Sequence, residues 1–138
     1  MTNSRNKGAS FEREVANLLT NDLNLTNNIR RILEQTREKH LPDLILGRWY
    51  LECKRYGSGA EPLEAWWQQV LAATKNKGIP ALVYKFDRRP IKVRVPLGAI
   101  NPELHLDSPF TADLLWDDFI FLLKELYTKD IAEHDDID

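Results

Sequence analysis

The sequence of 138 residues has little of what several kinds of functional site require. It has one cysteine, Cys53, which excludes an internal disulfide and a cysteine-based zinc site. It has no glycine-rich phosphate loop, and no apolar run approaches the roughly 20 residues that span a membrane. The polar N-terminus lacks the pattern of a signal peptide. We therefore expect a protein of the reducing cytoplasm that has no membrane partner.

What the chain does have is an ordinary globular composition with an uneven charge. Hydrophobic residues make up 43% and charged residues 29%, which suits one soluble domain with its own core. Residues 1–94 hold 17 Lys and Arg against 10 Asp and Glu, whereas residues 95–138 hold 2 against 11. A basic body of this kind favours a polyanionic partner.

The stretch from Leu41 to Arg55, LPDLILGRWYLECKR, predicts two short strands joined by a tight turn. Gly47 and Arg48 separate two apolar runs, and glycine at the first central position suits a two-residue type II′ turn. In such a hairpin Leu46 pairs with Trp49, and this pair sets the register of all the others.

That register predicts a charged face on the hairpin. Asp43 lies opposite Glu52, and Lys54 follows on the same face because side chains alternate along a strand. Leu51 and Cys53 then point to the other face. Two opposed carboxylates repel each other unless a proton, a cation or strong hydrogen-bond donors accompany them. Their oxygens are ligands that Mg²⁺ prefers, and a neighbouring lysine can orient a water or stabilise charge at a phosphate.

Pro42-Asp43 and, after eight intervening residues, Glu52-Cys53-Lys54 resemble the core motif of the PD-(D/E)xK nuclease superfamily. The resemblance implies a restriction-endonuclease-like fold and a metal-dependent endonuclease. It implies Asp43 and Glu52 as metal ligands, Lys54 as the group that orients the water, and the Cys53 carbonyl as a further ligand or support. Taken alone, the same spacing also fits a half-exposed hairpin with a surface salt bridge.

A helix is predicted over residues 9–23, with an apolar stripe along one side. On a helical wheel Glu12 falls inside this stripe, between Leu19 and Leu23, whereas Glu14 faces away. A carboxylate on a buried face is costly unless it is paired. Glu12 is therefore either a helix-start residue favoured by the macrodipole or a third acidic group directed at the metal site.

The segment from Lys7 to Glu14, KGASFERE, resembles the opening K-G-x-x-x-E-R-E of archaeal-type and phage Holliday-junction resolvases. In that family the first glutamate joins the metal site, which implies this catalytic role for Glu12. The apolar segment 78–86 resembles the same family, and the likeness extends over roughly residues 5–95. It implies branched DNA, in particular four-way junctions, and a homodimer that makes two symmetric nicks. A phage-encoded enzyme of this kind would act in the host-cell cytoplasm.

Many of these nucleases carry a glutamine near the attacking water, on the helix after the Glu-x-Lys strand. Here that helix begins near Pro62 and carries Gln68 and Gln69. We favour Gln68, because Gln69 follows Trp66 by three residues on the predicted core side. Each of the two also fits an ordinary exposed helix position.

Basic residues around the proposed site are candidate contacts to DNA phosphates. The run from Arg30 to Lys39 leads directly into the hairpin, and its alternative is a solvated edge. The full set of predicted DNA-binding residues is Arg5, Lys7, Arg13, Arg30, Arg31, Arg37, Lys39 and Arg55.

The element order predicts an α/β fold with a central mixed sheet of about five strands flanked by helices, αβββαββ followed by a C-terminal helix. Its first strand is expected over residues 27–35, its last helix over 111–127, and a disordered acidic tail over 128–138. Asp113, Asp117 and Asp118 are expected as surface charge on the last helix. One nuclease domain is thus expected over residues 1–127, with its core at about 5–95.

Mg²⁺ is the expected cofactor, with Mn²⁺ as a substitute, and branched or duplex DNA is the expected partner. Two alternatives to a junction resolvase stay open at this point. One is a restriction-type or flap-directed nuclease with the same site. The other is a DNA-binding module that keeps the fold without turnover.

Overall fold

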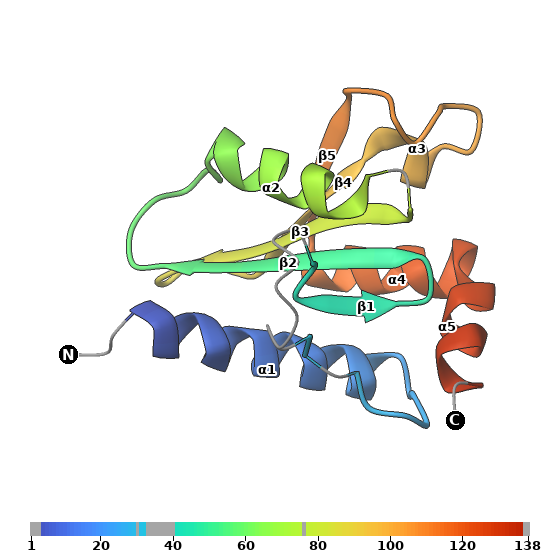
Figure 1. Cartoon of the computed structure of the whole chain (residues 1–138), viewed down its shortest axis with the longest axis horizontal. Helices are drawn as coiled ribbons and strands as arrows, with labels where there is room; N and C mark the ends of the chain where they lie inside the picture. The colour runs from blue at the N-terminus through green and yellow to red at the C-terminus, as the bar shows by residue number, and fades with distance from the viewer. Residues whose placement is uncertain (1–3, 30, 33–40, 76, 137–138) are drawn as a thin grey trace.

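The computed structural model describes residues 4–29, 31–32, 41–75 and 77–136. Its frame is one five-stranded sheet in the order β1-β2-β3-β4-β5 (Figure 1). The strands are β1 (Leu44–Leu46), β2 (Trp49–Tyr56), β3 (Ile79–Phe86), β4 (Lys92–Pro96) and β5 (Thr111–Leu115). The helices are α1 (Ser4–Asp22), α2 (Glu64–Thr74), α3 (Leu97–Ile100), α4 (Trp116–Leu126) and α5 (Thr128–Asp135). No helix among these residues is long and apolar enough to cross a bilayer.

The sheet is mixed because α2 carries the chain from the end of β2 back to the start of a parallel β3. The pairs β1–β2, β3–β4 and β4–β5 are antiparallel. The predicted α/β class, with a mixed sheet of about five strands flanked by helices, is confirmed.

Helices cover both faces of the sheet (Figure 1). On one face the apolar sides of α1 and α4 bury Leu19 and Phe119 together with Leu51 and Cys53 of β2. On the other face α2 packs its tryptophans against Leu82 and its neighbours on β3. Since side chains alternate along β2, its residues 52 and 54 face the α2 layer.

The β1–β2 hairpin has the predicted register, with the cross-strand pairs Leu44–Leu51, Ile45–Tyr50 and Leu46–Trp49. Gly47 has a φ of +55°, the sign that a type II′ turn requires at its first central position. A Cβ atom at Gly47 would lie 2.7 Å from the Asp130 Cβ. Glycine therefore serves both the turn and its close contact with α5.

The strand predicted over residues 27–35 is wrong in the part that the structure describes. Arg31 forms a single bridge with Leu44, and the Ile32 amide donates to the Asp43 carbonyl at 2.9 Å. Residues 30 and 33–35 of that prediction lie outside the described residues. Two backbone contacts hold this segment beside β1 without making it a strand of the sheet.

The fifth strand comes from a segment that was predicted to be helical. Residues 111–115 form β5, and α4 begins only at Trp116. Asp113 is therefore not helix-surface charge: it pairs across the sheet with Arg94 at 2.7 Å, and the Tyr84 hydroxyl donates to it. These cross-strand partners stabilise an extended conformation that local sequence does not reveal. At the other end of the chain, α1 begins at Ser4, earlier than the predicted residue 9.

The acidic tail that was predicted to be disordered contains α5, which packs against the body of the protein. Asp130 is 1% exposed, and it accepts hydrogen bonds from the Arg48 amide at 2.8 Å and from the Arg48 guanidinium at 3.0 Å. Asp135 accepts the amides of Thr26 and Asn27 at 2.9 and 3.1 Å. α5 thus ties the hairpin turn to the loop that follows α1.

Asp130→Ala removes the hydrogen bonds between α5 and the hairpin turn. We expect the free energy of unfolding to fall by about 1–3 kcal/mol, because the Arg48 amide and guanidinium lose their acceptor. Urea denaturation measures the change. Lys129→Ala, at an exposed neighbouring position, is the control and should stay within about 0.5 kcal/mol of the unmodified protein. Equal effects of the two variants would contradict the bracing role of Asp130.

Candidate active site

Asp43 stands where the pairing between β1 and β2 ends. Its amide donates to the Leu51 carbonyl at 3.0 Å, and its Oδ2 accepts the Cys53 amide at 2.8 Å. The carboxylate thus continues the hydrogen-bond ladder by one step along the edge of β2. The Cys53 carbonyl points to the same edge as its amide. Burial raises the pKa of the Cys53 thiol well above its usual range, which leaves the backbone as this residue's contribution to the edge.

Three carboxyl groups meet at this edge, and each comes from a different element. Glu12 extends from α1, Asp43 precedes β1, and Glu52 lies on β2. Asp43 lies close enough to both Glu12 and Glu52 for these carboxyl groups to shift one another's pKa. Glu52 is only 5% exposed. Carboxyl groups this close and this buried cannot all ionise without a compensating charge.

Burial raises the pKa of all three carboxyl groups. Desolvation, followed by the charge of Asp43, raises the pKa of Glu52 to about 8. Desolvation also raises the pKa of Glu12, where the Arg31 guanidinium opposes the rise. It raises the pKa of Asp43, where the hydrogen bond from the Cys53 amide opposes it. Glu52 therefore holds a proton near neutral pH, and a divalent cation can replace it.

Three nitrogen-bearing side chains surround the carboxyl groups. The Lys54 Nζ lies 4.0 Å from the Glu52 Oε1. The Gln69 Nε2 donates to that same oxygen at 3.0 Å, and the Arg31 Nη2 donates to the Glu12 Oε2 at 3.3 Å. The structure thus brings together the predicted residues Glu12, Asp43, Glu52 and Lys54, whose catalytic roles stay predictions.

Of the two glutamines, the structure places Gln69 beside the carboxyl groups and the preferred Gln68 elsewhere, while the catalytic role of either stays a prediction. The Gln68 Nε2 donates to the Glu64 Oε1 at 2.9 Å on the exposed side of α2, away from the carboxyl groups. Gln69 instead reaches Glu52. The core side of α2 faces the sheet, and Glu52 lies on that face of β2. Gln69 as a whole is exposed, so it contacts the site through the end of its side chain and not from a place in the core.

The donor set fits a hard divalent cation by its chemistry. Mg²⁺ takes one or two protein carboxylates, and water and phosphate oxygens complete its shell. Asp43 and Glu52 provide such a pair. In the described ranges, no three His, Cys, Asp or Glu side chains form a ready-made metal site as they stand. This arrangement favours two carboxylate ligands, with Glu12, which Arg31 holds, in a supporting position.

The predicted DNA contacts differ in their surroundings. Arg31 is paired with Glu12 at 3.3 Å, and Arg55 with Asp87 at 2.7 Å. Arg13 is exposed on α1. The side chains of Arg5 and Lys7 and the whole of Arg30, Arg37 and Lys39 lie outside the described part of the chain.

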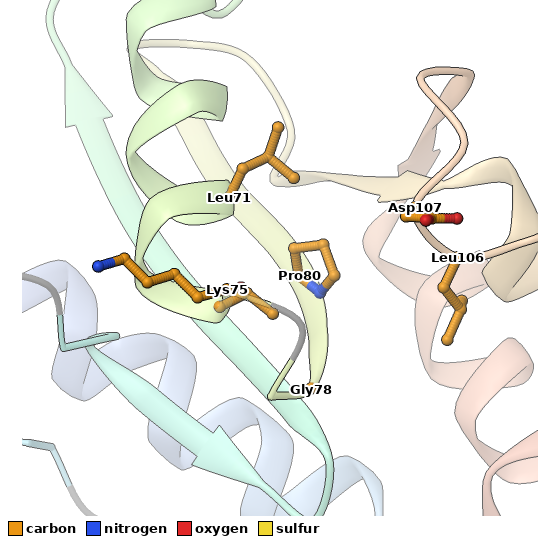
Figure 2. Close-up of a pocket in the computed structure, with 7 residues that line it drawn as sticks. Leu71, Lys75, Gly78, Pro80, Leu106 and Asp107 are labelled. Atoms are coloured by element: carbon orange, nitrogen blue, oxygen red, sulfur yellow. The ribbon is translucent and has the colours of Figure 1, made fainter.

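Two cavities lie elsewhere on the molecule. One of about 350 Å³ lies between the end of α2, the start of β3 and the loop at Leu106-Asp107, and Figure 2 shows Lys75 extending away from it. Another, of about 450 Å³, is lined by Arg48, Tyr127 and residues of the loop after α3. Neither cavity is lined by the three carboxyl groups. The candidate site is identified by its ionisable groups.

Residues 3–125 match the model of a protein family described as "Phage putative PDDEXK endonuclease". The chain belongs to this family. The match includes α1, the whole sheet and most of α4, so it extends beyond the predicted core of about 5–95 and ends before α5. No curated protein is similar enough to the chain to count as a match. Membership of the PD-(D/E)xK endonucleases is thus confirmed, while the likeness to Holliday-junction resolvases stays a prediction.

The raised pKa of Glu52 predicts how the stability of the protein in the absence of divalent metal depends on pH. Between the ordinary value of 4.5 and about 8, the folded protein holds a proton on Glu52 that the unfolded chain has released. The folded state then binds more protons, so the free energy of unfolding falls as pH rises through this window.

Glu52→Gln should flatten this fall, leaving the part that belongs to Glu12 and Asp43. Urea denaturation in EDTA, in steps from about pH 5 to about pH 8, measures the slope. Glu64→Gln, on the exposed side of α2, is the matched control and should keep the slope of the unmodified protein. A slope that Glu52→Gln leaves unchanged would show that Glu52 does not carry the proton.

Proposed function

We propose that the protein is a Mg²⁺-dependent endonuclease that hydrolyses phosphodiester bonds in branched DNA, in particular four-way junctions. The observation that carries the chemistry is the meeting of Glu12, Asp43 and Glu52 beside Lys54 at the edge of β2. Family membership supports a nuclease. The choice of branched DNA rests on the likeness of residues 7–14 to the opening of the resolvases.

Asp43 and Glu52 would hold the cation, with the Cys53 carbonyl as a further ligand and Glu12 as a ligand or support. When bound, Mg²⁺ supplies a Lewis acid that stabilises the charge developing on the phosphate during an in-line displacement. Mn²⁺ provides the same chemistry at such an oxygen-rich site.

The neighbouring side chains orient these groups. Gln69 and Lys54 both approach the Oε1 of Glu52, which would leave its other carboxylate oxygen available to the cation. Lys54 orients the attacking water and adds positive charge beside the phosphate. Arg31 holds Glu12 and limits the repulsion among the carboxylates. Such outer contacts keep metal ligands in place and raise affinity.

Resolution of a four-way junction requires two nicks, and a single chain offers one such site. The proposed active species is therefore a homodimer with an isologous interface, whose two-fold symmetry matches that of the junction. A restriction-type or flap-directed nuclease would use the same residues on another substrate, and a binding module would hold DNA without turnover.

Cleavage of an end-labelled four-way junction beside a linear duplex and a flap tests the proposal, with Mg²⁺ and with EDTA. We expect paired symmetric nicks on the junction only, and none in EDTA. Glu52→Gln should lower the rate at least about 100-fold, because it removes one carboxylate ligand. Glu64→Gln should keep full activity.

Cutting of all three substrates would support an endonuclease but contradict the proposed selectivity for four-way junctions. Salt-sensitive DNA binding without cleavage in Mg²⁺ or Mn²⁺ would contradict the proposed enzyme activity and favour a DNA-binding module.

The two adjacent glutamines of α2 provide a matched pair of variants. Gln69→Ala should lower the single-turnover rate about 10–100-fold or raise the Mg²⁺ concentration needed for half-maximal rate, because Glu52 loses its orienting donor. Gln68→Ala should leave both unchanged, since the Gln68 side chain donates to Glu64 on the exposed side of α2. The reverse order of effects would contradict the placement of Gln69.

A further inference from the structure

The turn between β3 and β4 is held against the end of the strand that carries the site. Tyr56, the last residue of β2, pairs with Phe86, the last residue of β3. The Asp87 amide donates to the carbonyls of Tyr56 and Gly57 at 3.2 Å, and its carboxylate pairs with Arg55 at 2.7 Å. The position of the turn relative to Glu52 and Lys54 is therefore set by β2 itself.

The next residue of this turn is an arginine in a conformation that favours glycine. Arg88 has a φ of +64°, in the left-handed region. The Arg89 amide donates to the Phe86 carbonyl at 3.1 Å, which closes a four-residue turn with Arg88 at its third position. Turns with positive φ at that position usually take glycine or asparagine there. An arginine at such a position costs stability, and backbone strain of this kind is concentrated at functional sites.

The side chains of Arg88 and Arg89 offer two adjacent positive charges to the solvent. Both residues are exposed, and neither takes part in an ion pair among the residues that the structure describes. Figure 1 places this turn at the same end of the sheet as the start of α1 and the loop after β2, and opposite α5. The charged turn thus extends the basic part of the chain and lies away from the acidic C-terminal helix.

The distance between the turn and the site corresponds to a few nucleotides along one DNA strand. Lys54 pairs with Tyr84, and Arg88 follows Tyr84 by four residues. At roughly 3.3 Å per residue along β3 and about 4.8 Å between strands, the backbones of Lys54 and Arg88 lie at most about 14 Å apart. Successive phosphates of one strand advance about 3.4 Å along the duplex axis. A guanidinium on this turn therefore reaches phosphates roughly two to four nucleotides from the one beside Lys54.

We propose that Arg88 and Arg89 bind the DNA backbone roughly two to four nucleotides from the scissile phosphate and thereby position it in the site. This inference rests on the proposed function, because it takes DNA as the substrate. The two arginines are positioning residues and contact no reacting atom. They recognise phosphate charge and not base sequence, which suits an enzyme that selects the shape of its substrate.

The salt dependence of DNA binding tests the proposal. Fluorescence anisotropy is measured on a labelled four-way junction, in a Glu52→Gln background so that the DNA stays intact. Arg88→Gly and Arg89→Gln should each lower the slope of log K against log[salt] by about one unit, and together by about two. Lys124→Ala, on the exposed side of α4, should leave the slope unchanged.

Arg88→Gly also separates DNA binding from folding. Glycine adopts the left-handed conformation without strain, so the melting temperature should stay the same or rise while binding weakens. A merely structural role for Arg88 would lower the melting temperature and leave the salt slope unchanged. An unchanged slope in both single variants would overturn the proposal.

Neutral methylphosphonate linkages, introduced one at a time, locate the contact. A linkage two to four nucleotides from the cleavage point should weaken binding several-fold with both arginines present, and should have no effect on the double variant. Equal sensitivity of the two proteins at every position would overturn the proposal. If the arginine variants lower the salt slope but the unmodified protein cleaves no DNA, the phosphate contact is supported and the proposed nuclease activity is wrong. If the parent protein does not bind DNA, both proposals are wrong.

Discussion

The register of the β1–β2 hairpin is the constraint on which the candidate site depends. Pairing of Leu46 with Trp49 leaves Asp43 just beyond the end of β1, where its carboxylate takes the Cys53 amide in place of a backbone carbonyl. A slip of one residue would turn every side chain of the strand to the opposite face. Glu52 would then enter the α1 layer, and the three carboxyl groups would no longer meet. The hydrogen bonding at this edge of the sheet and the acidic cluster beside it thus depend on the same hairpin register.

Much of the fold follows from local pattern, and the rest depends on distant partners. The Gly47-Arg48 turn between two apolar runs predicted the hairpin, and helical spacing predicted α1 and α2. β5 was missed because its apolar residues continue the spacing of α4, while the partner that keeps it extended, Arg94, lies 19 residues away. α5 was missed because acidic composition favours solvent, whereas the buried acceptor role of Asp130 involves Arg48, 82 residues earlier.

The placement of the site residues was more predictable than the periphery because Glu12, Glu52 and Lys54 lie on regular elements and Asp43 directly precedes one. The helical wheel predicted that Glu12 lies on the buried side of α1, and strand alternation predicted that Glu52 and Lys54 share one face of β2. The placement of the adjacent glutamines differs from expectation for a physical reason. Position on α2 was used to assign Gln69 to the core side, whereas the residue is exposed and the end of its side chain reaches the Glu52 carboxylate. Helix periodicity predicts which side of a helix is covered, but not which polar group lies beneath it.

The bond between Asp130 and the hairpin turn has a consequence for how the protein is made. The turn leaves the ribosome 82 residues before the aspartate that braces it. At about 5–20 residues per second, the hairpin waits roughly 4–16 seconds for α5 to be synthesised. During that interval β3, β4 and β5 are themselves still being synthesised. The nascent chain therefore passes through a stage in which the hairpin turn has been made but Asp130 cannot yet anchor it.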